Sequence, residues 1–192
     1  MDQFVDQYMN PLIQSFRKII QFLEKEKVSY TIIGGIANSF YGNPRQTFDI
    51  DIKFEMDEQN VSGFIQQLST VGRLAADDPI AFFKETAVIP VDIDNVRVDL
   101  VRSLLPFEKE AIRRSKREAI FGLKALVCTA EDLIIQKAVS VRDKDWMDIS
   151  AIIHLQYTKL DWDYLMQHIK DLSVFLDDPQ IENRIKKIKN EA

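Results

Sequence analysis

The stretch GGIANSFYGNPRQTFDIDIKFE, residues 34–55, decides the fold expected for this chain. Its last eight residues alternate between apolar and polar side chains, which is the period-2 pattern of a half-buried strand. The apolar face is predicted to carry Phe48, Ile50, Ile52 and Phe54, and the polar face Asp49, Asp51, Lys53 and Glu55. Because residues i and i+2 of a strand point the same way, Asp49 and Asp51 project as a pair of carboxylates.

A glycine pair precedes this strand and is predicted to cradle an anion. Gly34-Gly35 separates a short buried strand at residues 30–33 from a helical pattern at residues 36–42. Glycine allows the backbone to approach a phosphate closely, and the N–H groups at a helix start favour anions. Three polar side chains nearby could complete the cradle: Asn38, Ser39 and Arg45. The alternatives are a capping or surface role for the first two and neutralisation of the acids for the arginine.

A third acid follows on a later strand. Residues 86–91 and 96–101 are predicted to be two strands, joined by a turn that holds the pair Asp92-x-Asp94. Asp99 lies on the polar side of the second strand. If that strand neighbours the one at 48–55, its carboxylate joins the other two.

Three carboxylates on one face indicate a binding site for divalent cations. Ionised carboxylates repel one another unless a counter-charge is present. Mg²⁺, or Mn²⁺ in its place, is a hard cation that combines carboxylates with phosphate oxygens, and three carboxylates can hold two such ions. We therefore expect Asp49, Asp51 and Asp99 to bind metal beside the phosphates of a nucleoside triphosphate (NTP). The alternative is a solvated sheet face with no ligand.

The rest of the pattern predicts a fold of α/β (α+β) class, with a small mixed sheet flanked by helices and a helical C-terminal part. Residues 2–27 have helical spacing, as two short helices or one kinked at Pro11, and Pro90 indicates an edge strand. Residues 119–128 look extended with a break at Gly122. The other predicted helices are 58–70 capped by Asp57, 106–117, 130–141 capped by Thr129, 145–156, 162–175 and 179–190. The expected domains are residues 1–128 and a helical region, 129–192, packed on them.

Composition narrows the class of protein. The chain has 192 residues, of which 46% are hydrophobic and 29% charged, with a net charge of −5. No apolar run approaches the roughly 18 residues of a membrane span, and the acidic N-terminus is unlike a signal peptide, so we expect a cytoplasmic protein without membrane contact. The single cysteine, Cys128, excludes a disulfide within the chain and is expected to be a small buried hydrophobe. Two basic clusters, at residues 113–117 and 184–189, are either solvated helix faces or a local nucleic-acid contact.

These residues resemble the nucleotidyltransferases related to DNA polymerase beta. That superfamily shows Gly-Gly or Gly-Ser, about a dozen residues, Asp-x-Asp or Asp-x-Glu, and a later lone acid on a strand. The chain is most similar to the AbiEii-type family, through Arg45-x-Thr47-x-Asp49-x-Asp51. That family includes the toxin halves of bacterial toxin–antitoxin pairs. The tRNA CCA-adding enzymes and the aminoglycoside nucleotidyltransferases are similar in fewer features.

The resemblance implies an enzyme that moves a nucleoside monophosphate (NMP) from an NTP to an acceptor hydroxyl and releases pyrophosphate. It implies Thr47 beside the nucleotide, Lys137 as a phosphate-contacting cation and Asp145 as a later acid, with Asp148 as the second choice. The acceptor could be a tRNA end, a protein or a small molecule, and an antitoxin could be a partner. The alternative is a nucleotide-binding or regulatory module with this fold and no turnover.

Overall fold

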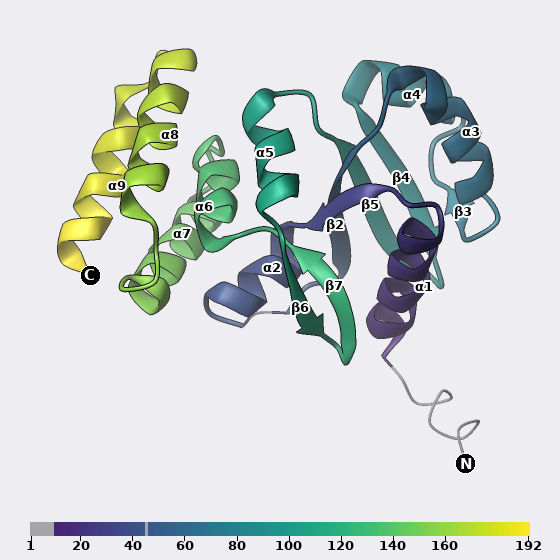
Figure 1. Cartoon of the computed structure of the whole chain (residues 1–192), viewed down its shortest axis with the longest axis horizontal. Coiled ribbons are helices and arrows are strands. Elements are labelled where there is room, and N and C mark those ends of the chain that lie inside the picture. The colour runs from purple at the N-terminus through teal and green to yellow at the C-terminus, as the bar shows by residue number, and fades with distance from the viewer. Residues whose placement is uncertain (1–9, 45) are drawn as a thin grey trace. The chain divides into compact units, whose positions relative to one another are not determined.

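The computed structural model describes residues 10–44 and 46–192, which form seven strands and nine helices (Figure 1). The mixed α/β class predicted from the sequence is therefore confirmed. The predicted helical pattern at residues 2–9 and the proposed phosphate ligand Arg45 lie outside the described residues. Within the described residues, every helix is too short or too polar to cross a lipid bilayer.

The strands are β1 (Ser29–Ile32), β2 (Asp49–Glu55), β3 (Arg73–Leu74), β4 (Val88–Ile93), β5 (Val96–Arg102), β6 (Lys116–Ile120) and β7 (Leu123–Val127). The helices are α1 (Pro11–Lys25), α2 (Gly34–Tyr41), α3 (Glu58–Leu68), α4 (Pro79–Thr86), α5 (Pro106–Arg114), α6 (Ala130–Ala138), α7 (Asp143–Gln156), α8 (Trp162–Phe175) and α9 (Pro179–Glu191).

The contacts of the chain divide it into two compact units. Among the described residues, the sheet unit comprises 10–36 and 46–127, and the helical unit comprises 37–44 and 128–192. Helix α2 begins in the sheet unit and ends in the helical unit. The division into domains expected from the sequence, with a boundary after residue 128, stays a prediction.

One seven-stranded sheet, in the order β3-β4-β5-β2-β1-β7-β6, forms the centre of the sheet unit. The pairs β2–β5 and β1–β7 are parallel, and the other pairs are antiparallel. The strand that carries Asp49 and Asp51 thus lies directly beside the strand that carries Asp99. This neighbour relationship was a condition of the predicted site, and the structure meets it.

The period-2 pattern of β2 separates a packed face from a polar face. Ile50, Ile52 and Phe54 are fully buried. Phe54 stacks on Phe64 of α3 at 5.5 Å between ring centroids, and helix α1 contacts the same strand. On the polar face, Lys53 is also buried, because it is paired with Glu108 of α5. Helix α5 therefore covers one end of the polar face of β2.

Phe48 is a correction to the predicted apolar face. The strand begins at Asp49, so Phe48 precedes the ladder and its side chain is 73% exposed.

Four further elements differ from the sequence prediction. Helix α5 ends at Arg114, and Lys116 and Arg117, predicted as its last turn, belong to β6, which pairs with β7. Helix α4 and strand β3 were not predicted, although Asp78 caps α4 and Pro79 is its first residue. Strand β4 is not an edge strand, because β3 pairs with it at Arg73↔Asp92 and Leu74↔Val91. Helix α3 starts at Glu58, as predicted, but the side chain of its predicted cap, Asp57, makes no capping hydrogen bond.

In the helical unit, the predicted cap of α6 is confirmed. The backbone N–H of Asp132 donates to the Thr129 hydroxyl at 3.2 Å, and that hydroxyl donates to the Asp132 carboxylate at 2.7 Å. Tyr164 of α8 donates to the other oxygen of Asp132 at 2.7 Å, which ties α8 to the start of α6. Arg184 of α9 lies over the Trp146 ring of α7 at 3.8 Å, and Cys128 is buried as expected.

Candidate active site

The three predicted aspartates share one face of two adjacent strands in the sheet unit. The residues Asp51 and Asp99 are register partners on β2 and β5, and Asp49 pairs with Arg97. Register partners on neighbouring strands present their side chains to the same face, about 4.8 Å apart at the backbone. Asp49 is exposed, whereas Asp51 and Asp99 are half-buried. The backbone thus brings together three acids that are up to fifty residues apart in the chain.

The pKa of Asp99 reflects its burial and three charged neighbours. Burial raises the pKa of Asp99, and Arg97 opposes that rise. The carboxylates of Asp49 and Asp92 add to the rise, so the net pKa is above its ordinary value. A carboxylate in this position is costly to ionise without a cation beside it.

Backbone geometry explains why two glycines stand before the acids. Gly34 has a φ of +62°, and a Cβ there would lie 1.8 Å from Oδ2 of Asp51. A Cβ on Gly35 would lie 2.4 Å from Oγ1 of Thr47. The start of α2 therefore presses against the carboxylate side of β2. In the structure the glycine step lies close to the side chains of Asp51 and Thr47. A phosphate contact at the same step stays a prediction.

Thr47 positions the first acid. Its hydroxyl donates a hydrogen bond of 2.8 Å to Oδ1 of Asp49. Thr47, Asp49 and Asp51 alternate along the chain, so the threonine and both acids face the glycine pair. The contact gives Thr47 a role in holding Asp49, whereas a contact with nucleotide stays a prediction.

The three aspartates fit a hard divalent cation in donor type and in backbone position. Their carboxylate oxygens are the ligands that Mg²⁺ and Mn²⁺ prefer. As the side chains lie, no three His, Cys, Asp or Glu residues in the described part of the chain form a group that would hold a metal ion. A metal ion held by the three aspartates would therefore require their side chains to rotate.

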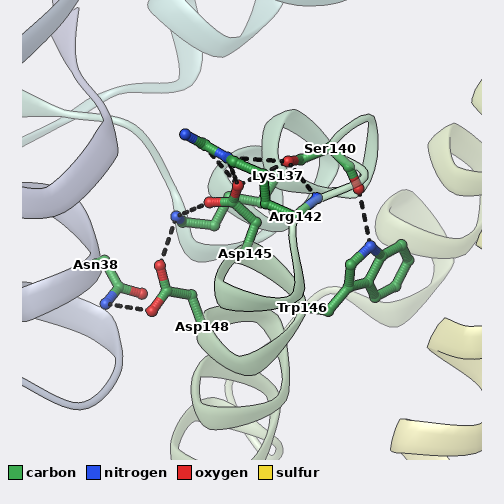
Figure 2. Close-up of polar contacts among 7 residues, drawn as sticks. All are labelled: Asn38, Lys137, Ser140, Arg142, Asp145, Trp146 and Asp148. Carbon is green, nitrogen blue, oxygen red and sulfur yellow. Dashed lines mark hydrogen bonds and ion pairs between the residues drawn. The ribbon is translucent and has the colours of Figure 1, made fainter.

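A second cluster of predicted residues lies within the helical unit, around a buried lysine (Figure 2). Lys137 is 7% exposed and donates to Asp145 at 3.0 Å and to Asp148 at 2.7 Å. Ser140 and Arg142 also donate to Asp145, each at 2.7 Å. Burial acts to raise the pKa of Asp145, but these three donors outweigh it and lower that pKa below its ordinary value.

The structure changes the interpretation of Asp145 and Asp148. The sequence interpretation chose between Asp145 and Asp148, whereas Lys137 binds both. Their spacing of three residues places both acids on one face of α7, and that spacing was the available signal. Ser140 and Arg142 were missed, because nothing in their local sequence indicates a shared carboxylate partner.

Helix α2 contributes the predicted residues Asn38 and Ser39 to the helical unit. Asn38 is buried, and its amide donates to Asp148 at 3.2 Å. Its Oδ1 atom is buried without a hydrogen-bond partner in the described residues. Ser39 is half-buried on the same helix. The structure thus links Asn38 to the lysine cluster through Asp148, and nucleotide contacts by either residue stay predictions.

Solved nucleotidyltransferase structures share this fold. The solution structure of the antibiotic-resistance factor ANT(2″)-Ia aligns with a TM-score of 0.57 at 16% identity, over 86% of this chain and 93% of that chain. An antigenic nucleotidyltransferase-like protein from Paracoccidioides brasiliensis aligns with a TM-score of 0.56 at 15% identity, over 92% of each chain. The lincosamide antibiotic adenylyltransferase LnuA, with lincomycin bound, aligns with a TM-score of 0.52 at 16% identity, over 74% of this chain and 96% of that chain.

The fold is that of the nucleotidyltransferases, and a family match gives the class of the chain. The chain belongs to the family described as nucleotidyltransferase of unknown function (DUF6036), and the match extends over residues 10–191. No curated protein matches the chain in sequence.

Proposed function

We propose that the protein transfers NMP from an NTP to an acceptor hydroxyl, with release of pyrophosphate, and that the reaction depends on Mg²⁺ or Mn²⁺. The observation that carries this proposal is the register pairing of Asp51 with Asp99, with Asp49 two residues away on the same face. Family membership supports the same reaction class. We further propose that it acts in the cytoplasm, where NTPs and Mg²⁺ are abundant.

In this proposal Asp49 and Asp51 hold two metal ions, and Asp99 holds the one beside the acceptor. The ions neutralise the triphosphate and the leaving pyrophosphate when they are bound. Asp99 also accepts the proton of the acceptor hydroxyl, a role that general-base catalysis asks of a nearby carboxylate. Thr47 keeps the Asp49 carboxylate oriented through its hydrogen bond. Catalysis then consists mostly of positioning and of neutralising charge.

The proposed phosphate contacts come from the backbone of Gly34 and Gly35 and from Arg45. On the helical unit we propose Lys137 as a further phosphate-contacting cation. An ammonium group has three donor hydrogens, and its bonds to Asp145 and Asp148 account for two. Asp145 keeps the ammonium oriented. Asn38 and Ser39 are proposed as further nucleotide contacts.

A transfer assay tests the reaction. The protein is incubated with each labelled NTP and Mg²⁺, together with total RNA, protein extract or a panel of antibiotics. We expect label transfer to one acceptor class, loss of transfer in Asp51→Ala and full transfer in Asp77→Ala, a control that removes an exposed acid. Transfer that survives in Asp51→Ala would refute the assignment. Binding of Mg²⁺–NTP without transfer to any acceptor would identify the alternative, a nucleotide-binding module.

The finer resemblance to the AbiEii-type family supports a second proposal, that the protein acts as a toxin. Its support is the motif Arg45-x-Thr47-x-Asp49-x-Asp51. Expression of the wild-type protein should arrest growth, and expression of Asp51→Ala at the same level should not. An antitoxin partner would be a neighbouring gene product that restores growth. Equal growth with both proteins would refute the toxin role, but it would not count against the proposed nucleotidyl transfer.

A further inference from the structure

A polar pocket lies at the end of the sheet where β3, β4 and β5 meet. Its volume is about 490 Å³, and its lining consists of Arg73, Asp92, Asp94, Asn95 and Arg97. This volume is in the range of sites that take small molecules or single groups of larger ones. The pair Asp92-x-Asp94, which the sequence indicated as a turn, thus forms part of a concave site.

Two backbone features build this pocket. Asp94 and Asn95 both have positive φ, 49° and 64°, as in a tight turn between β4 and β5. Gly72 lies so close to β4 that a Cβ on it would be 2.6 Å from the Asp92 carbonyl oxygen. This approach places the next residue, Arg73, beside Asp92. The two arginines therefore reach the pocket from different strands.

The pocket lining holds two arginines and two aspartates, and Lys18 beside it adds a third cation. Arg73 pairs with Asp92 at 2.6 Å, and Arg97 pairs with the other oxygen of Asp92 at 3.3 Å. Asp94 is paired with Lys18 at 2.7 Å. Two guanidinium groups thus share one carboxylate, and each keeps further N–H donors in a fixed fork. Such a pair favours a phosphate group, which accepts several charge-assisted hydrogen bonds.

The pocket adjoins the three catalytic aspartates through Arg97. Arg97 is the register partner of Asp49, and it lies two residues before Asp99 on the same face of β5. Its positive charge opposes the rise that burial causes in the pKa of Asp99. A phosphate held by Arg97 would therefore place a hydroxyl of the same molecule near Asp99.

We propose that this pocket is the acceptor site and that Arg73 and Arg97 select an acceptor whose hydroxyl lies close to a phosphate group. The inference rests on the proposed nucleotidyl transfer and specifies its substrate class. The phosphate belongs either to a small phosphorylated compound or to the last phosphodiester of a nucleic-acid strand. Asp92 keeps the two guanidinium groups in place between turnovers.

The test compares acceptors that differ in their phosphate. Transfer from a saturating labelled NTP is measured to glycerol 3-phosphate, to glycerol, to an RNA trinucleotide and to its terminal nucleoside. We expect the phosphorylated member of one pair to be used at least tenfold more efficiently. Arg73→Gln should raise the KM of that acceptor about tenfold and leave the KM of its unphosphorylated partner unchanged. Lys84→Gln, which removes an exposed cation of α4 outside both basic clusters, should change neither value.

A binding measurement without turnover keeps the two proposals separate. The side-chain Nε–H signals of Arg73 and Arg97 are followed by NMR during titration with glycerol 3-phosphate, the trinucleotide or glycerol. Shifts with a phosphorylated probe only would support the inference, even where no acceptor is labelled, and failure of transfer would then count against the proposed function alone. Equal transfer to both members of each pair, or no phosphate-specific shift, would overturn the acceptor site and leave nucleotidyl transfer intact.

Discussion

Asp51 and Asp99 are register partners on the adjacent parallel strands β2 and β5, although forty-seven residues separate them in the chain. The pairing fixes their Cα atoms side by side, so the two side chains project from the same face of the sheet. Burial raises the pKa of Asp99, and the charge of Asp49 on the same face adds to that rise. The aspartate carboxylates of the sheet unit therefore repel one another, and a divalent cation bound between them would relieve this repulsion.

This repulsion should appear as a cost in stability when metal is absent. Asp99→Asn removes one charge from the group, so we expect it to raise the free energy of unfolding by roughly 0.5–1 kcal/mol at pH 7, after allowance for solvent screening. Urea denaturation in the presence of EDTA measures this value. The same variant should lose the rise in melting temperature that Mg²⁺–NTP gives the wild type. A variant that is less stable than the wild type in EDTA would contradict the electrostatic account.

Gly34 should not tolerate a side chain. In Gly34→Ala the new Cβ would meet Asp51 at 1.8 Å with φ at +62°, so the start of α2 or the carboxylate must move. We expect a loss of about 1–3 kcal/mol in the free energy of unfolding and weaker binding of Mg²⁺–NTP. Gly63→Ala is the control, because it lies inside α3 with nothing within 4 Å of its Cβ position. That change should stabilise the protein by about 0.5–1 kcal/mol.

Lys137 should be needed for folding as well as for any phosphate contact. Lys137→Met leaves Asp145 and Asp148 buried without their shared ammonium. Removal of one partner from a buried ion pair typically costs about 3–5 kcal/mol. Denaturant unfolding checks this value, with Lys144→Met on the exposed face of α7 as the matched control. A loss below about 1 kcal/mol in Lys137→Met would show that the cluster contributes little to stability.

The lysine cluster should also make stability depend on pH. Hydrogen bonds and ion pairs lower the pKa of Asp145 in the folded protein, relative to about 3.9 in an unfolded chain. The stabilisation is present above the unfolded value and is lost as the pH falls through the lower, folded value. We expect the free energy of unfolding to fall more steeply from pH 5 to pH 2.5 in the wild type than in Asp145→Asn. Parallel curves for the two proteins would exclude this contribution of Asp145.

The local sequence was sufficient to predict the acidic strand. Strict alternation from Asp49 to Glu55 indicates a strand with one buried face, and the two aspartates could be assigned to the other face. The pairing of this strand with β5 could not be predicted, because hydrophobic pattern does not specify strand order. Phe48 fits the alternation but precedes the first paired residue, so the pattern predicted a strand that is one residue too long.

Elsewhere, tertiary contacts overrode local preference. Lys116 and Arg117 continue a run of good helix formers, yet they pair with Val127 and Leu126 of β7. The partners of Lys137 could not be predicted from local sequence either, since they lie eight and eleven residues away on the next helix. The sequence predicted that the glycine step approaches a phosphate, and that stays a prediction. The contact of Gly34 with Asp51 could not be predicted, because it depends on the packing of α2 against β2.

The central claim is that Asp49, Asp51 and Asp99 converge on divalent cations beside bound NTP. The most direct test is to titrate Mn²⁺ into ¹³C-labelled protein that is saturated with a non-hydrolysable NTP analogue, and to follow the aspartate carboxyl signals by NMR. The account expects the three signals to broaden together at substoichiometric Mn²⁺, while the exposed Asp77 stays sharp. If the three signals stay sharp, or if only one of them broadens, the shared metal site is contradicted.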